Sequence, residues 1–313
     1  MGTEFRIVLY APDEGAAARG FEAAFARLDE IDARLSDYRP ESELSRLGRS
    51  SDGGPLVEGA PVSEDLWRVL ARAQQLGRSS GGAFDVTVGP LVRLWRRARR
   101  QDRLPDPEEL TAARERVGVE LLELDGGLHR VRLLRRSMRL DLGGIGKGFA
   151  LDEALATLRD AGIERALVDG GGDLALGEAP PGRAGWIVRL EPGTPGATPT
   201  HLELARAGIA TSGHAGRGFE LEGRRYSHIL DPRSGEPLVA APAASVFAPD
   251  ATTADACASA ACVLGPEAGR AWLESLPGVE GRLWSPEKAA ASPCETSGFA
   301  RRMTSLPPAS LEP

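Results

Sequence analysis

Residues 137–173, SMRLDLGGIGKGFALDEALATLRDAGIERALVDGGGD, place a glycine-rich turn between two apolar runs. From Leu151 to Leu158 apolar residues recur at i, i+3, i+4 and i+7, a spacing that predicts a helix with one buried face. The flanking runs SMRLDL and ALV predict strands. The stretch therefore predicts a strand, loop, helix and strand unit that ends in the turn DGGGD.

The sequence around this unit predicts further elements of both kinds. On its N-terminal side we expect a strand at 4–10, a helix at 18–35, a helix capped by Ser63, mostly helical structure to about 120, and a hairpin around Asp125-Gly126-Gly127. On its C-terminal side we expect an irregular connector at 178–200 with one short strand, a hairpin around Glu222-Gly223, a strand at 244–248 and a helix from Thr252 or Thr253.

Composition excludes several classes of protein. The chain has 313 residues, 42% hydrophobic and 27% charged, which is typical of one large globular domain or two smaller ones. The net charge of −7 disfavours a nucleic-acid partner, and we interpret the basic clusters Arg93–Arg103 and Arg130–Arg139 as solvated faces. No run of about 20 apolar residues predicts a transmembrane segment. Cys257, Cys262 and Cys294 lack metal-site spacing and are interpreted as packing residues.

The turn from Asp141 to Gly148, DLGGIGKG, is the first candidate site. Glycines let a backbone approach a phosphate, the following helix offers free N–H groups, and Lys147 adds a positive charge. The spacing is neither GxGxxG nor GxxxxGKS, so it indicates a nucleotide or diphosphate site of neither common type. The alternative is a tight turn with a surface lysine. Asp169-Gly-Gly-Gly-Asp173 is a weaker signal of the same kind, for which a purely structural turn is the favoured interpretation.

Asp255 and Ser259 form the second candidate site. They stand at i and i+4 of a predicted helix, so both oxygens project from one face. A carboxylate and a hydroxyl suit Mg²⁺, which completes its coordination with phosphates and water. The alternative is a carboxylate that stabilises the helix N-terminus beside a packed serine.

His228 is the third candidate. It ends a predicted strand, just before a turn built by Asp231-Pro232. With an ordinary pKa of about 6.5, a histidine there can act as a general base near neutral pH. The alternative is a structural histidine.

These segments, in this order, resemble the FAD:protein FMN transferase (ApbE) family. The matching blocks extend over residues 1–303 and are MGTEF, LSDYRPESELSRL, GGAFDVTVGPLVRLW, LDLGGIGKGFALDEA, ALVDGGGDLALG, IATSGH, YSHILDPRSGEPL, the Asp255 helix and SGFARRM. The resemblance implies an α+β fold related to the T-fold, with a mixed sheet core, a smaller helical lobe at about 63–120 and a ligand cleft between them. We expect residues 1–303 to form one catalytic domain and 304–313 a flexible tail.

The resemblance also implies an activity. Members of the family use Mg²⁺ to split the diphosphate of FAD and transfer FMN to a threonine or serine hydroxyl of an acceptor flavoprotein, releasing AMP. Some members instead hydrolyse FAD to FMN and AMP. Two alternatives therefore stay open beside transfer, an FAD diphosphatase and a non-catalytic flavin-binding protein.

Carried over position by position, the resemblance implies the residues of the site. His228 matches the histidine that deprotonates the acceptor hydroxyl, and the metal ligands fall on Asp255, Ser259 and the backbone carbonyl of Gly144. The FAD contacts fall on Met1, Tyr38, Ala83, Phe84, Asp85, Asp141, Lys147 and Ile229.

The chain departs from the family pattern at two positions and in its start. Ser259 stands where the family commonly has threonine, and Ala258 stands where some members have a second acidic ligand, which predicts weaker metal binding. No secretory signal precedes the first block, so the chain as written is expected to be cytoplasmic. A natural start upstream, as in the family's exported or lipid-anchored members, would make it periplasmic or membrane-associated.

Overall fold

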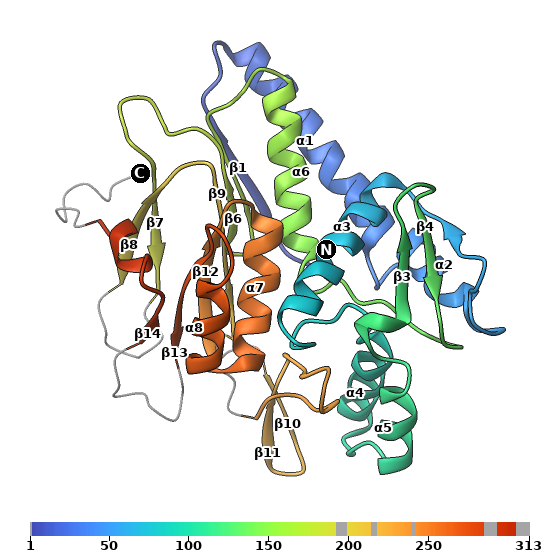
Figure 1. The fold of residues 1–313 in the computed structure, drawn as a ribbon. Helices are drawn as coiled ribbons and strands as arrows, with labels where there is room; N and C mark the ends of the chain where they lie inside the picture. The colour runs from blue at the N-terminus through green and yellow to red at the C-terminus, as the bar shows by residue number, and fades with distance from the viewer. Residues whose placement is uncertain (1, 192–198, 214–217, 240–241, 285–292, 305–313) are drawn as a thin grey trace.

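The computed structural model describes residues 2–191, 199–213, 218–239, 242–284 and 293–304, which form helices packed on a central β-sheet (Figure 1). The helices are α1 (Glu14–Leu35), α2 (Glu43–Ser50), α3 (Glu64–Ser79), α4 (Gly89–Gln101), α5 (Pro107–Arg114), α6 (Gly146–Asp160), α7 (Ala251–Leu264) and α8 (Pro266–Glu274), with short 3₁₀ turns η1 (Val119–Leu121) and η3 (Phe299–Arg302). None of the helices in these ranges is long and apolar enough to cross a membrane.

The strands form one large sheet and three small ones. They are β1 (Phe5–Leu9), β2 (Ala60–Pro61), β3 (Leu122–Asp125), β4 (Arg130–Leu133), β5 (Ala166–Gly170), β6 (Asp173–Leu176), β7 (Trp186–Leu190), β8 (Thr200–Leu204), β9 (Ala207–Ser212), β10 (Gly218–Leu221), β11 (Arg224–Ser227), β12 (Ala243–Ala248), β13 (Glu280–Trp284) and β14 (Cys294–Glu295). The seven-stranded central sheet has the order β1-β5-β6-β9-β12-β13-β14.

The expected α+β class is confirmed, and neighbouring strands of the central sheet run antiparallel rather than in mixed directions. The connection between β5 and β6 shows why. Gly171 and Gly172 join them with φ of 65° and 94°, and so short a connection joins only antiparallel strands.

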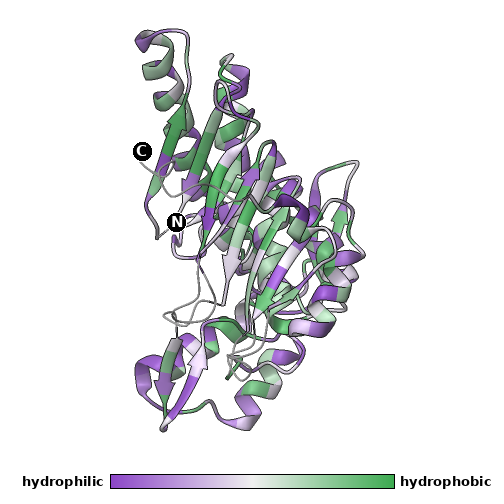
Figure 2. Ribbon diagram, turned by 90° about the vertical axis from the view of Figure 1, so that its left-hand side faces the viewer, coloured by the Kyte–Doolittle hydropathy of each residue, from purple (hydrophilic) through white to green (hydrophobic). Residues whose placement is uncertain are grey.

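The central sheet separates two hydrophobic layers. Along β5, Val168 points into the core shared with α1, α6 and α7, whereas Leu167 points into a second cluster with β7 and β8. This alternation follows from the two-residue period of a strand. Figure 2 shows many of the strands as hydrophobic, consistent with a sheet that is covered on both faces.

Helices α6 and α7 lie in direct contact on the helical side of the sheet. A Cβ atom on Gly148 would lie 2.1 Å from the carbonyl oxygen of Ala251, so only glycine permits this approach. Helix α7 is buried through small side chains, among them Cys257 and Cys262, which occupy packing positions as expected. Burial raises the pKa of both thiols to about 12.

Residues 63–120 are largely helical, as predicted. Ser63 caps α3, accepting a hydrogen bond from the Leu66 N–H at 3.3 Å. Helix α3 contributes to the main core, whereas α4 and α5 pack in separate clusters, one of them with β10 and β11 (Figure 1). Trp95 of α4 donates a 2.8 Å hydrogen bond to the Gly235 carbonyl, which fixes α4 against the loop after β11.

Both predicted hairpins form, as β3–β4 and as β10–β11. The strand predicted for SMRLDL does not. Residue Ser137 has φ of 57°, and the segment makes a single bridge, between Arg139 and Val88. Its alternating burial is real, because Met138, Leu140 and Leu142 are buried, but α4 packs against this segment, with Gly89 lying on the Arg139 backbone.

Candidate active site

The glycine-rich turn places Lys147 in the first turn of α6, between two buried carboxylates. The Lys147 ammonium forms an ion pair with Asp173 of β6, and its Nζ lies 3.6 Å from Asp255 Oδ1 of α7. The Gly148 N–H donates to Asp255 Oδ2 at 3.1 Å. Asp173 also accepts a hydrogen bond from the Thr211 N–H at 3.2 Å. Residues of β6, α6 and α7 thus meet at the Lys147 ammonium.

A second group of oxygens lies on the same face of α7. Ser259 Oγ lies 3.2 Å from Ser212 Oγ of β9. A Cβ atom on Gly144 would lie 3.1 Å from Ser259 Oγ and 3.3 Å from the Phe84 ring, so the glycine keeps this gap open. Asp255 and Ser259 therefore present their oxygens toward the same turn, as their spacing predicts.

This donor set fits a hard divalent cation. Asp255 is 3% exposed, and its carboxylate, the Ser259 hydroxyl and the adjoining backbone of Gly144 are the kind of oxygen donors that Mg²⁺ prefers. Among the described residues no group of three or more His, Cys, Asp or Glu forms a metal cluster. The site therefore suits an ion that takes few protein ligands and shares its coordination with a phosphate-bearing substrate.

Tyr38 and Asp141 meet through Arg96, a residue that the sequence analysis did not assign to the site. The guanidinium of Arg96 lies 4.6 Å from the centre of the Tyr38 ring and donates to the Tyr38 hydroxyl at 3.1 Å. It also lies 3.4 Å from Asp141 Oδ2 and 2.5 Å from Asp37 Oδ2. Burial, followed by the charge of Asp37, raises the pKa of Asp141. Tyr38 is 72% exposed, so most of its ring is available to a ligand.

The other predicted FAD contacts are mostly buried. Ala83, Phe84, Asp85 and Ile229 are each less than 10% exposed. Asp85 accepts hydrogen bonds from the Thr87 N–H and hydroxyl at 2.8 and 2.6 Å, and burial raises the pKa of its carboxyl group. These side chains therefore offer little ring or carboxylate surface to a ligand.

His228 follows β11, between the buried residues Ser227 and Ile229, and backbone hydrogen bonds hold this segment. The Ser227 N–H donates to the Leu238 carbonyl at 2.7 Å, and the Leu238 N–H donates to the Ile229 carbonyl at 2.9 Å. The His228 side chain is exposed to solvent, in a position that an approaching macromolecule can reach.

The structure thus brings together Lys147 with Asp255, and Gly144 with Ser259. Met1 lies outside the described residues. Three residues were missed or misread. Asp173 was interpreted as part of a structural turn, Ser212 was quoted only within a block, and Arg96 was placed in a solvated basic cluster. Only Lys147 and Lys288 among the 38 basic residues are lysines, and a lysine in so arginine-rich a chain was the signal that could have pointed to an acidic partner such as Asp173.

Comparisons with known proteins agree with this architecture. The model of the ApbE family matches residues 1–283. A Treponema pallidum protein named FAD:protein FMN transferase is 34% identical over 305 residues, covering 92% of this chain and 83% of its own. An Escherichia coli K12 protein of the same name is 32% identical over 278 residues, covering 85% and 77%.

Solved structures show the same fold. The flavin transferase ApbE from Vibrio cholerae superposes with a TM-score of 0.85 at 29% identity, covering 96% of each chain. The ApbE protein from Thermotoga maritima superposes with a TM-score of 0.84 at 26% identity, covering 97% of each. With the family model matching nearly the whole sequence, the chain belongs to the ApbE family.

Proposed function

We propose that this protein is an FAD:protein FMN transferase, which attaches FMN through a phosphoester to a threonine or serine of an acceptor flavoprotein and releases AMP. The observation that carries the proposal is that Lys147, at the end of the glycine-rich turn, lies beside the buried carboxylate of Asp255, with the Ser259 hydroxyl on the same face of α7. Relatives with this fold carry the name of that activity. A diphosphate is the natural substrate for a cation and a magnesium-type donor set placed side by side.

In this reaction the oxygen of the acceptor hydroxyl forms a bond to the FMN phosphorus, and the bond from that phosphorus to the oxygen of AMP breaks. The hydroxyl proton passes to His228, and AMP leaves with the electron pair of the broken bond. A hydroxyl is a poor nucleophile without a base, and the exposed loop position of His228 suits a base that acts on a second protein.

The chain's own residues would hold the substrate. Lys147 places a positive charge beside the phosphate oxygens, and Tyr38 offers its exposed ring to a flat heterocycle. Gly144, Asp255 and Ser259 would hold Mg²⁺, which when bound neutralises charge on the diphosphate. A single carboxylate ligand predicts modest metal affinity.

The test is to incubate the protein with FAD, Mg²⁺ and candidate acceptor flavoprotein domains that carry an exposed threonine. We expect one acceptor to gain the mass of FMN less one water, with one AMP released per acceptor. Its threonine-to-alanine variant is the matched control. AMP and free FMN released without any acceptor would instead identify an FAD diphosphatase, and FAD binding without AMP release would identify a carrier.

A further inference from the structure

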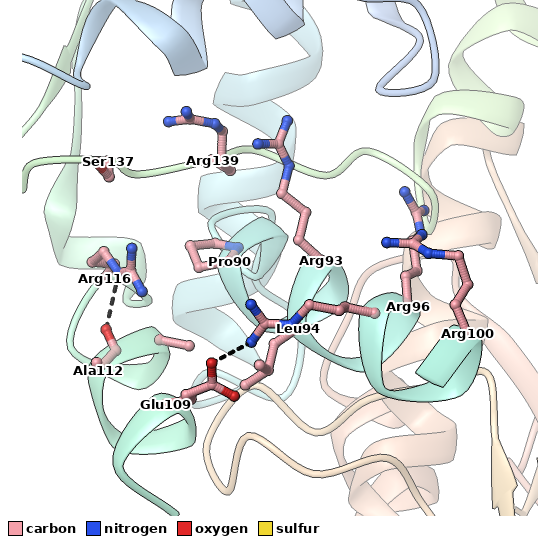
Figure 3. Close-up of a pocket in the computed structure, with 12 residues that line it drawn as sticks. Pro90, Arg93, Leu94, Arg96, Arg100, Glu109, Ala112, Arg116, Ser137 and Arg139 are labelled. Atoms are coloured by element: carbon pink, nitrogen blue, oxygen red, sulfur yellow. Dashed lines mark hydrogen bonds and ion pairs between the residues drawn. The ribbon is translucent and has the colours of Figure 1, made fainter. Parts of the chain in front are cut away.

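A cavity of about 630 Å³ lies between α4, α5 and the segment around residues 137–139, and arginines dominate its lining (Figure 3). Six guanidinium groups line it, from Arg93, Arg96, Arg97, Arg100, Arg116 and Arg139, against one carboxylate, that of Glu109. Four of them belong to the basic cluster Arg93–Arg103, whereas Arg116 and Arg139 come from later segments of the chain. We call this cavity the arginine pocket. It stands out on a chain whose net charge is −7.

Half of these arginines lack a carboxylate partner. Ion pairs with N–O distances of 2.5, 2.6 and 2.6 Å join Arg96 to Asp37, Arg97 to Glu109 and Arg139 to Asp52. Within the described part of the chain, no carboxylate lies within ion-pair distance of Arg93, Arg100 or Arg116. The nearby acidic groups therefore do not balance the charge of the arginine pocket.

Arg93 and Arg139 show that grouping these positive charges is energetically unfavourable. Both line the arginine pocket (Figure 3), and partial desolvation, followed by the charge of Arg139, lowers the pKa of Arg93 despite the opposing effect of Asp37 and Asp52, although the Arg93 side chain remains exposed. The Nε atom of Arg139 is also buried without a hydrogen-bond partner among the described residues. A bound anion would offset the repulsion between the two guanidinium groups.

We propose that the arginine pocket binds an anion with several linked phosphates. A guanidinium group donates two parallel hydrogen bonds to a phosphate, and three groups without a carboxylate partner around one cavity can engage more than one phosphate, although Arg116 Nε also donates to the Ala112 carbonyl at 2.9 Å. The volume is within the range of small-molecule sites and exceeds what one phosphate fills. Pro90, Leu94 and Ala113 add an apolar part of the lining, which suits the base of a nucleoside polyphosphate.

The arginine pocket adjoins the proposed FAD site but has a different lining. None of the residues that the resemblance assigns to FAD lines the arginine pocket. Arg96 is shared by the arginine pocket and the proposed FAD site, because it lines the pocket and contacts Tyr38 and Asp141. A ligand in the pocket should therefore bind protein that already holds FAD.

The test is calorimetric titration of the whole, metal-free protein with inorganic tripolyphosphate, since the probe would chelate Mg²⁺. We expect one site per chain, with an affinity that falls as salt is added. The variant Arg93→Gln/Arg116→Gln should bind at least about 10-fold more weakly, as loss of two charge-assisted contacts implies. Arg100→Gln/Arg116→Gln is a second pocket variant, in case the first fails to fold.

The matched control is Arg78→Gln/Arg99→Gln, which removes the same charge outside the pocket lining and should bind like the wild type. The titration is repeated after saturation with FAD, where we expect unchanged stoichiometry. Binding that FAD abolishes and the pocket variants leave intact would assign the anion to the FAD site and overturn the proposal. Because pocket variants are compared directly, this result does not depend on whether FMN transfer is observed.

Two further probes identify the source of the anion. ATP that binds about 10-fold more tightly than tripolyphosphate, in a manner sensitive to the pocket variants, would assign the apolar lining to a nucleoside. Equal affinities would assign the site to inorganic polyphosphate. A hexaglutamate peptide that binds where tripolyphosphate does not would overturn the proposal and show an acidic protein segment as the occupant.

Discussion

Lys147 Nζ lies 3.6 Å from Asp255 Oδ1, and the same ammonium is paired with Asp173. One cation therefore serves two carboxylates that are each less than 5% exposed. A buried carboxylate left without its partner typically costs about 3–5 kcal/mol, so the ion group contributes to stability as well as to the site.

Replacing Lys147 should lower the stability of the protein and weaken the site. We expect Lys147→Met to lower the free energy of unfolding by about 3 kcal/mol in metal-free buffer, because two buried carboxylates lose their counter-charge. Added Mg²⁺ should raise the thermal midpoint of Lys147→Met more than that of the wild type. Differential scanning fluorimetry with and without Mg²⁺ measures this, and equal shifts in both proteins would argue against a metal site beside Asp255.

The hydroxyl at position 259 should control metal affinity. We expect Ser259→Ala to raise the Mg²⁺ concentration for half-maximal AMP release at least about 10-fold, because a ligand oxygen is lost. Ser259→Thr keeps that oxygen and is the matched control, with an expected Mg²⁺ dependence close to that of the wild type. If Ser259→Ala shows the wild-type Mg²⁺ dependence, the serine is not a ligand.

His228 should be important for FMN transfer to the acceptor and should contribute little to FAD binding. We expect His228→Ala to slow acceptor modification about 100-fold or more, the usual contribution of a general base, while FAD affinity stays within about twofold. Acceptor mass measured over time gives the rate, and FAD titration gives the affinity. Raising the pH should partly restore the variant, since hydroxide can replace the lost base. Transfer at the wild-type rate would exclude His228 as the base.

Asp152 should make stability depend on pH. Its carboxylate accepts hydrogen bonds from the N–H groups of Ala251 and Thr252 at 2.9 and 2.8 Å, yet burial raises its pKa from 3.8 to about 6. A raised folded pKa contributes stability that is fully present below pH 3.8 and is lost as pH rises through about 6.

The free energy of unfolding that is lost as Asp152 ionises amounts to at most about 3 kcal/mol. Urea unfolding at pH 4 to 8 measures it, with Asp152→Asn as the nearly isosteric reference that does not titrate. We expect the difference in unfolding free energy between wild type and Asp152→Asn to shift in favour of the variant as pH rises. A difference independent of pH would mean that the Asp152 pKa is ordinary.

The contact at Gly148 should tolerate no side chain. In Gly148→Ala the new methyl group would meet the Ala251 carbonyl oxygen at 2.1 Å, which forces α6 and α7 apart. We expect the free energy of unfolding to fall by about 1–3 kcal/mol, measured by urea titration. Gly53→Ala, with nothing within 4 Å of the new atom, is the control and should unfold like the wild type.

Local patterns predicted much of the fold because their signals lie within a few residues. The Ser63 cap, the Glu222-Gly223 hairpin and the shared face of Asp255 and Ser259 are of this kind. The strand predicted for SMRLDL does not form, because the alternating burial of Met138, Leu140 and Leu142 comes from packing in the main core, while the segment makes only a single β-bridge.

Parts of the site that depend on distant pairing could not be predicted in this way. The ion pair of Asp173 with Lys147 spans the whole of α6 and one strand, and a glycine-rich turn gave no reason to expect it. Arg96 reaches Tyr38 and Asp141 from a third segment. Asp173 and Arg96 are charged residues of kinds that usually lie on the surface. Their ion pairs form because the fold brings distant segments together, which the sequence alone does not reveal.

The close approach of α6 and α7 has a consequence for how the protein meets its substrate. Lys147 and Asp255 are carried on backbones that touch at Gly148 and Ala251, so neither can move far without the other. The backbone segments that carry the two charges therefore keep their separation before the substrate binds. Little backbone ordering entropy remains to be lost on association, so affinity should depend more on the loss of water from the charged groups.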